Sequence, residues 1–172
     1  GAAGFIGANF IRYLLDEQVF GGRVVNVDAL TYAGSLENLK EFTASPKYVF
    51  VRGDIRDRML VENLLKQYSV DTVVHFAAES HVDRSITNAE DFVQTNVIGT
   101  FTMLEAARAY WSALGTAPKA AFRFHHVSTD EVFGSLSPAE EGGGLFVETS
   151  PYQPNSPYSA SKAASDHLVR AW

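Results

Sequence analysis

Cysteine is absent from this sequence of 172 residues. The chain therefore offers no disulfide, no thiolate nucleophile and no cysteine metal ligand. Basic residues are also few: 14 lysines and arginines stand against 20 aspartates and glutamates, for a formal net charge of -6. Nucleic-acid binding depends on a basic patch or stripe, so we expect no nucleic-acid partner.

Long hydrophobic runs are missing as well. No segment approaches the roughly 20 apolar residues that a transmembrane helix requires, and no signal peptide precedes Gly1. We therefore expect no membrane partner and a cytoplasmic location.

Short apolar runs and helical patterns are what the chain does contain, and they alternate along it. The expected strands are 24–27, 48–51, 72–76 and 122–127, and the expected helices are 5–17, 59–65, 92–111 and one beginning near Tyr158. Short, continuous apolar runs are typical of strands buried on both faces of a sheet. The alternation predicts an α/β fold, namely a Rossmann-type doubly wound parallel sheet with helices on both faces. The one long irregular stretch, 134–157, is expected to be functional.

Gly1, Gly4 and Gly7 are spaced by three at the start of the first expected helix. In a dinucleotide-binding turn the first glycine allows a tight turn, the second lets backbone N–H groups approach a pyrophosphate, and the third permits close helix packing. A glycine-rich helix start without a ligand is the alternative. Asp28, 21 residues after Gly7, favours the dinucleotide site, because a carboxylate there accepts hydrogen bonds from the adenosine ribose. The same carboxylate would repel the extra phosphate of NADP, so the predicted cofactor is NAD.

Asp54 directly follows an expected strand, at the carboxyl edge of the sheet. Two interpretations of this residue are open. It accepts a hydrogen bond from the adenine amino group while Ile55 packs on the ring, or it caps the N-terminus of a helix over 56–67.

Tyr158 and Lys162 are four residues apart, which places phenol and ammonium on one face of a helix. A nearby cation favours the phenolate and lowers the pKa of a tyrosine. Such a phenol can remove a proton from a sugar hydroxyl as a hydride leaves for a nicotinamide. A surface pair is the alternative, and the glycine turn, Asp28 and the strand pattern argue against it.

The triplet of Thr129, Asp130 and Glu131 follows the fourth expected strand, at the edge where open α/β sheets bind ligands. Adjacent carboxylates there can supply one protonated acid and one ionised base, although a solvated turn that starts a helix is the alternative. The histidines of the segment 75–81 do not predict a metal site, because a strand-to-loop run does not converge its ligands. His125 and His126 are expected to be ordinary strand residues.

At these residues the chain resembles the extended short-chain dehydrogenase/reductase family of NAD-dependent epimerases and dehydratases. The matching segments follow one another over nearly the whole chain: Gly1–Gly7, Asp28–Gly34, Gly53–Asp57, His75–Ser85, Thr95–Asn96, Ser128–Gly134 and Pro157–Ala163. The pair Asp130 and Glu131 points to the 4,6-dehydratases of the family, because its epimerases usually lack the two carboxylates. Phe133 is a departure, since many relatives carry tyrosine there.

The resemblance implies a role for each reacting residue. Tyr158 takes the proton of the glucose C4 hydroxyl as hydride passes to NAD, and Lys162 lowers the pKa of the phenol and holds the nicotinamide ribose. Thr129 hydrogen-bonds the C4 oxygen. Glu131 removes the C5 proton, Asp130 protonates the departing C6 hydroxyl, and hydride returns to C6. The product is a 4-keto-6-deoxy sugar nucleotide.

The resemblance also implies which residues line the site. The expected cofactor residues are Gly1, Gly4, Phe5, Ile6, Gly7, Asp28, Ala29, Leu30, Thr31, Asp54, Ile55, Phe76, Ala77, Ala78, Ser80, Thr95, Tyr158 and Lys162. The expected substrate residues are Ser80, Thr129, Asp130, Glu131 and Tyr158. No metal is expected.

The resemblance finally bears on organisation and substrate. It implies that residues 1–172 are part of an NAD-binding Rossmann domain whose first strand and C-terminal sugar-nucleotide domain lie outside the chain, so that the chain alone is inactive. dTDP-glucose is the favoured substrate, with UDP- or CDP-glucose 4,6-dehydration, UDP-sugar 4-epimerisation and an inactive NAD-binding module as alternatives. A homodimer is expected, with the helices over 92–111 and from Tyr158 onward as candidate contacts.

Overall fold

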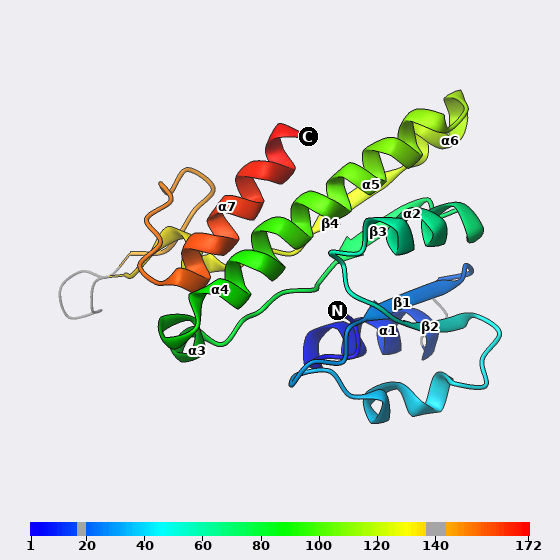
Figure 1. The fold of residues 1–172 in the computed structure, drawn as a ribbon, viewed down its shortest axis with the longest axis horizontal. Helices are drawn as coiled ribbons and strands as arrows, with labels where there is room; N and C mark the ends of the chain where they lie inside the picture. The colour runs from blue at the N-terminus through cyan, green and yellow to red at the C-terminus, as the bar shows by residue number, and fades with distance from the viewer. Residues whose placement is uncertain (17–19, 137–143) are drawn as a thin grey trace. The chain divides into compact units, whose positions relative to one another are not determined.

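The computed structural model describes residues 1–16, 20–136 and 144–172, so part of the irregular stretch expected over 134–157 lies outside the described residues. Strands and helices alternate through these ranges, which confirms the α/β class (Figure 1). The chain divides into two compact units. The first unit contains residues 1–77 and 102–125, and the second contains residues 78–101 and 126–172.

Two parallel strands begin the first unit, and they are packed against a helix. β1 (Val24–Asp28) pairs with β2 (Tyr48–Arg52) in a register that runs from Val24 opposite Tyr48 to Asp28 opposite Arg52. α1 (Phe5–Asp16) and the 3₁₀ segment η1 (Leu36–Phe42) cover this pair. The shared core consists of Ala8, Ile11, Leu39, Phe42 and Tyr48, with Ala2, Leu15, Val24 and Phe50 packed against it.

A second strand pair lies in the same unit. β3 (Thr72–His75) pairs with β4 (Arg123–His126), whose last residue belongs to the second unit. α2 (Arg58–Gln67), α5 (Thr100–Ala113) and α6 (Thr116–Ala121) accompany these strands along the chain. Their core consists of Val61, Leu65, Val73, Ala106 and Tyr110, with Val70, Met103, Leu114, Phe122 and Phe124 packed against it.

Among the described residues the strands form two pairs, β1 with β2 and β3 with β4, and no described strand hydrogen-bonds to both pairs. All four expected strands are present within one or two residues of their predicted bounds.

The second unit is built from helices around a polar interior. α3 (Val82–Thr87), α4 (Ala89–Phe92) and the π-helical segment η2 (Val93–Gly99) all contact α7 (Pro157–Ala171). α4, η2 and α5 follow one another without interruption, so the helix expected over 92–111 contains a π-helical turn near its start. Such turns are rare in proteins overall, and those that do occur are often at functional sites.

The short 3₁₀ helix η3 (Asp130–Phe133) completes the second unit and contacts α7. In the described parts of the chain, none of the helices combines the length and the apolar character needed to cross a membrane.

Candidate active site

The glycine turn and Asp28 are bound to each other at the end of β1. Asp28 is buried, and its Oδ2 accepts a hydrogen bond of 2.9 Å from the backbone N–H of Ala3. Its Oδ1 accepts a hydrogen bond of 2.8 Å from the N–H of Leu30. Leu30 has a positive φ of 54°, an uncommon backbone conformation that tends to persist where the surrounding structure holds it. The carboxylate therefore organises both the turn and the residues after β1.

Gly1 and Gly7 are required by close backbone contacts in this turn. A Cβ atom on Gly1 would lie 2.4 Å from the Cα and N atoms of Ala77, and one on Gly7 would lie 2.5 Å from the Cα of Ala2. Gly4 is different, because a Cβ atom there would lie 3.6 Å from its nearest neighbour, the carbonyl oxygen of Gly1. The first and third glycines are thus required by backbone packing, whereas a Cβ atom at the second would make only ordinary van der Waals contacts.

The start of α1 leaves two large apolar side chains uncovered. Phe5 is 82% exposed and Ile6 is 65% exposed. Ala29 and Thr31 are exposed beyond β1, and Phe76 packs on Phe10 with ring centroids 5.3 Å apart. Exposed apolar side chains beside a glycine turn and a helix N-terminus fit the cradle of a dinucleotide.

Asp54 does not cap a helix, which corrects one of the two interpretations of this residue. The N-cap of α2 is Asp57, whose side chain accepts a hydrogen bond from the N–H of Leu60. Asp54 instead binds Arg56 through its backbone N–H at 2.8 Å and its guanidinium at 2.6 Å, and these hydrogen bonds hold the pKa of Asp54 below its usual value. The predicted partner Ile55 is buried. The adenine interpretation of Asp54 stays a prediction.

α7 places Tyr158 and Lys162 at the interior of the second unit. The helix begins with a capping box between Ser156 and Ser159 and has Pro157 in its first turn, the arrangement that favours helix initiation. Tyr158 is 8% exposed and Lys162 is 3% exposed, so the two residues are buried on the same helix. The surface-pair alternative is therefore wrong.

Burial and the side chains of the segment 129–131 act on the phenol of Tyr158. Burial raises the pKa of Tyr158, the hydrogen bond with Thr129 lowers it, and the negative charges of Glu131 and Asp130 raise it. The net result is a pKa above the ordinary value. The Tyr158 ring is held edge-on by Phe92, with centroids 6.2 Å apart.

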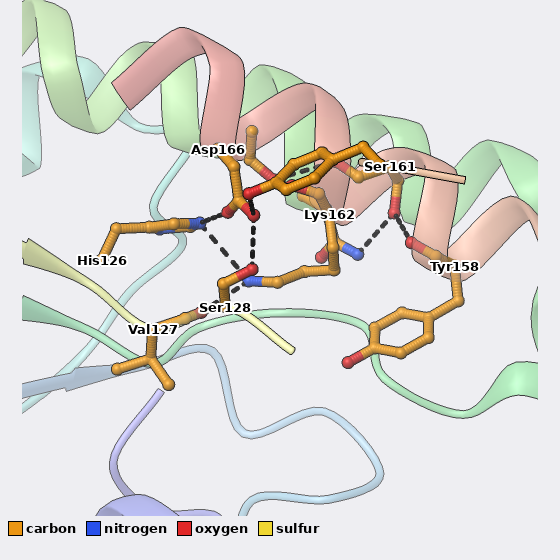
Figure 2. A network of polar contacts seen from close by, with 10 residues as sticks. His126, Val127, Ser128, Tyr158, Ser161, Lys162 and Asp166 are labelled. Atoms are coloured by element: carbon orange, nitrogen blue, oxygen red, sulfur yellow. Dashed lines mark hydrogen bonds and ion pairs between the residues drawn. The ribbon is translucent and has the colours of Figure 1, made fainter. Parts of the chain in front are cut away.

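Lys162 does not act on the phenol as expected. Its Nζ donates a hydrogen bond of 2.7 Å to the carbonyl oxygen of Val127 and lies 3.5 Å from Nε2 of His126 (Figure 2). Burial lowers the pKa of Lys162, and Asp166 raises it. The expectation of a lowered Tyr158 pKa is therefore not met in this structure, because burial and nearby carboxylates outweigh the other effects on the phenol.

The triplet after β4 forms the start of η3. Thr129 is the N-cap of this short helix, and its Oγ1 accepts a hydrogen bond of 3.3 Å from the N–H of Glu131. Asp130 is exposed, whereas Glu131 is partly buried. The helix-starting turn and the functional interpretation are thus compatible, because the capping residue is also the one that reaches Tyr158.

Asn96, in the π-helical segment, joins two other parts of the second unit. Its Nδ2 donates to the carbonyl of Glu79 and to Oγ of Ser161, both at 2.9 Å, and its Oδ1 accepts from the N–H of Glu79 at 2.8 Å. The neighbouring candidates Thr95 and Ser80 are partly buried and exposed, respectively. The motif Thr95–Asn96 signalled this position, but its spacing did not reveal its partners.

His126 and Asp166 are functional candidates that sequence reasoning missed. Nε2 of His126 lies 3.1 Å from Oδ1 of Asp166, so His126 is not an ordinary strand residue as expected. The spacing of Asp166, four residues after Lys162, was the available signal. Among the described residues, no cluster of histidine, aspartate and glutamate side chains is suited to a metal ion.

The structure therefore assembles the predicted site residues into two groups. In the first unit, the glycine turn, Asp28 and Leu30 form one connected group. In the second unit, Tyr158 lies with Thr129 and within the electrostatic influence of Asp130 and Glu131. The second group contains a phenol, a hydroxyl and two carboxyls, which are the groups needed for hydroxyl deprotonation and acid–base elimination.

Comparison with known proteins gives a consistent result over the whole chain. A sequence model of the family described as GDP-mannose 4,6 dehydratase matches residues 1–172. A dTDP-glucose 4,6-dehydratase of Neisseria meningitidis is 55% identical over 172 residues, which are 100% of this chain and 47% of the relative. A second, from Xanthomonas campestris pv. campestris, is 57% identical and again covers 100% of this chain and 47% of the relative.

Solved structures show the same likeness. The dTDP-glucose 4,6-dehydratase DesIV of Streptomyces venezuelae, with NAD and a second ligand bound, has a TM-score of 0.86 and 48% identity, over 99% of this chain and 49% of that one. A UDP-glucose 4-epimerase of Thermus thermophilus, in complex with NAD, has a TM-score of 0.80 and 30% identity, over 99% and 48% of the two chains. These neighbours confirm the Rossmann-type fold. The chain spans about half the length of the curated relatives it matches.

Proposed function

The chain belongs to the GDP-mannose 4,6-dehydratase family, and from this membership we propose that it forms the cofactor-binding and acid–base part of a dTDP-glucose 4,6-dehydratase. The observation that carries the proposal is the buried phenol of Tyr158, on which Thr129, Asp130 and Glu131 all act. A simple dehydrogenase needs a hydroxyl and a phenol, whereas elimination also needs an acid and a base. The second unit contains all four groups.

NAD fits the residues of the first unit. Phe5 and Ile6 are exposed beside the glycine turn, and Asp28 has lone pairs beyond those used by Ala3 and Leu30. We propose that these residues hold the pyrophosphate and the adenosine ribose. When bound, NAD accepts a hydride from the sugar and returns it, so it is not consumed.

Four side chains of the second unit supply the proton transfers. Tyr158 takes the proton of the C4 hydroxyl as its phenolate, and Thr129, which acts on that phenol, orients the C4 oxygen. The 4-keto group acidifies the C5 proton, which the Glu131 carboxylate removes. Asp130, the more exposed of the two carboxyls, protonates the departing C6 hydroxyl. Lys162, held by Val127, would bind the nicotinamide ribose.

The nucleotide is proposed from the relatives. Those at 52–57% identity are named dTDP-glucose 4,6-dehydratases, whereas the 4-epimerases among the solved structures are 25–30% identical. The two carboxylates beside Tyr158 also favour elimination over epimerisation.

The proposed function is tested with the whole protein that contains this chain. We expect it to convert dTDP-glucose to a 4-keto-6-deoxy product, detected by its absorbance in alkali, faster than UDP-glucose, CDP-glucose or GDP-mannose. Formation of a C4 epimer without loss of water would instead establish the epimerase alternative. NAD binding without any turnover would establish the binding module.

We also propose that the whole protein is a homodimer. Support comes from an exposed aromatic pair in the second unit, Phe101 and Trp172, which stack edge-on with centroids 5.7 Å apart and remain 40% and 48% exposed. Aromatic side chains are enriched in subunit interfaces. Sedimentation equilibrium of the whole protein would show twice the monomer mass, and a monomer would refute the proposal.

A further inference from the structure

Asp166 is a carboxylate of α7 that the proposed proton transfers do not use, although it is well buried. Its side chain is 11% exposed, and that of His126 is 5% exposed. Oδ2 of Asp166 accepts hydrogen bonds from Oγ of Ser128 at 2.5 Å and from the hydroxyl of Tyr152 at 2.9 Å. Nε2 of His126 lies 3.1 Å from Oδ1 (Figure 2), so three side chains from two segments of the second unit converge on one carboxylate.

His126 and Ser128, which both contact Asp166, lie on either side of Val127 in the chain. Side chains of an extended segment alternate between faces, so His126 and Ser128 can both reach Asp166 from one side. Between them, the carbonyl oxygen of Val127 accepts the hydrogen bond from Nζ of Lys162. Asp166 therefore fixes, on both sides, the residue that holds the lysine. The residue after Ser128 is Thr129, which contacts Tyr158.

Spacing along α7 completes the arrangement. Tyr158, Lys162 and Asp166 follow one another at intervals of four, so they lie along one face of the helix. Burying a carboxylate is costly unless hydrogen bonds and charge compensate for the loss of water. A buried anion at this position thus requires a counterpart, and its neighbours include a buried ammonium one turn away.

We propose that Asp166 is a positioning residue of the dehydratase site, which acts through the segment 126–128 to hold Lys162 at the carbonyl oxygen of Val127 and Thr129 in place beside Tyr158. This inference rests on the function proposed above and adds a residue to its machinery. Asp166 itself touches neither the phenol nor any reacting atom.

The charged and titratable groups around Asp166 come from β4, η3, α7 and the segment before α7. His126 of β4 faces Asp166, Asp166 acts on the lysine and the phenol, and Asp130 and Glu131 of η3 act on the phenol. Burial raises the pKa of Asp166, but its contacts with His126, Ser128 and Tyr152 lower it below the ordinary value, so the group is ionised at neutral pH. Arg170 acts on Tyr152 from the end of α7.

Asp166 shifts the pKa values of Tyr158 and Lys162 in the same direction, which gives a testable prediction. The anion of Asp166 raises the pKa of Tyr158 and raises that of Lys162. Neutralising it by Asp166→Asn therefore lowers both pKa values. Because the reaction depends on the ionisation of both groups, the pH–rate profile should move to lower pH.

The test compares the whole protein with its Asp166→Asn variant. We expect kcat for dTDP-glucose to fall about tenfold or more, KM to change little, and the pH–rate profile to move to lower pH. Glu90→Gln, which neutralises an exposed carboxylate of α4, should leave the profile in place. Ser128→Ala and Tyr152→Phe each remove one hydrogen bond but keep the charge, so they should lower kcat without moving the profile.

A second readout does not depend on turnover. The phenol of Tyr158 titrates in the ultraviolet difference between the protein and its Tyr158→Phe variant, and in the Asp166→Asn background this titration should move to lower pH. If the unmodified protein dehydrates no sugar nucleotide, the proposed function fails, and this titration still decides the role of Asp166.

Four results would overturn the inference. An unmoved pH–rate profile or an unmoved phenol titration in Asp166→Asn would do so, as would an equal shift in Glu90→Gln. If Asp166→Asn does not fold, full kcat in both Ser128→Ala and Tyr152→Phe would overturn it, whereas a loss in kcat at constant KM would support it.

Discussion

Glu131 and Asp130 are adjacent carboxyl groups in different surroundings. Both raise the pKa of the Tyr158 phenol, yet Asp130 is exposed and Glu131 is partly buried, with its N–H bound to Thr129. The Asp130 carboxylate accepts a hydrogen bond of 3.4 Å from Oγ1 of Thr129, and the Glu131 carboxylate is the less exposed of the two.

Glu131→Gln should separate elimination from the first proton transfer. The amide has nearly the same size but cannot take up the C5 proton, so formation of the 4-keto-6-deoxy product should fall by about 10²-fold or more, while oxidation at C4 remains possible. Product absorbance in alkali and the spectrum of reduced nicotinamide measure the two steps. Glu148→Gln, at an exposed position, is the matched control. Unchanged product formation in Glu131→Gln would refute its assignment.

Asp28 combines a structural and a proposed binding role, which one substitution can test. Asp28→Asn removes the charge and replaces one of the two oxygens that accept from Ala3 and Leu30. Hydrogen bonds to charged groups contribute about 1.5–3 kcal/mol, so NAD affinity should fall roughly tenfold to a hundredfold.

Discrimination against NADP should fall too, because the repelling charge is gone. Calorimetric titration with both cofactors measures this, and Asp16→Asn at the exposed end of α1 is the control. Unaltered affinity for NAD would contradict the ribose role of Asp28.

At the scale of elements, α7 connects stability to chemistry. One helix carries Tyr158, Lys162 and Asp166, and it contacts α3, α4, η2 and η3. Most of its buried side chains are polar, and hydrogen bonds such as that between Asn96 and Ser161 hold it in place. A shift of α7 would therefore move Tyr158, Lys162 and Asp166 together, relative to Asp130 and Glu131 of η3.

Ser156→Ala should destabilise α7 at its first turn. Oγ of Ser156 accepts a hydrogen bond of 3.0 Å from the N–H of Ser159, and loss of an N-cap side chain costs about 1 kcal/mol. Denaturant unfolding of the whole protein should show a decrease of this size in unfolding free energy. Thr149→Ala, at an exposed loop position, should change it little. Equal stability of the two variants would show that the capping box is not needed.

At the scale of the molecule, the chain is much shorter than the relatives that it matches. The chain spans 47% of the relatives that are named as dehydratases. Its described strands form two pairs, and the proposed cofactor and acid–base residues lie in two compact units. The residues that select the nucleotide base are not among those assigned above.

We expect the purified 172-residue chain to show no dehydratase turnover, whereas the whole protein does. The reason is that this chain corresponds to only 47% of the length of a relative named as a dTDP-glucose 4,6-dehydratase. The alkali absorbance assay with dTDP-glucose measures both samples side by side. Measurable turnover by the 172 residues alone would refute the prediction.

The sequence by itself determined the features that depend on local periodicity. Strand positions, the helical spacing of Tyr158 and Lys162, and the glycine turn with Asp28 all follow from patterns within short segments or from one fixed spacing. Such patterns are readable because backbone geometry repeats every two residues in strands and every 3.6 in helices.

Only the tertiary structure decided which distant residues meet. The partners of Asp166 and Asn96 lie 38 and 65 residues away in the chain, at Ser128 and Ser161, and no local pattern pairs them. The raised pKa of Tyr158 was also beyond sequence reasoning, because it depends on burial and on which charges reach the phenol. Lys162 was predicted correctly to lie on the same helix face as Tyr158, but its hydrogen bond goes to the backbone carbonyl oxygen of Val127. Every residue type has such a carbonyl, so no signal in the sequence pointed to this partner.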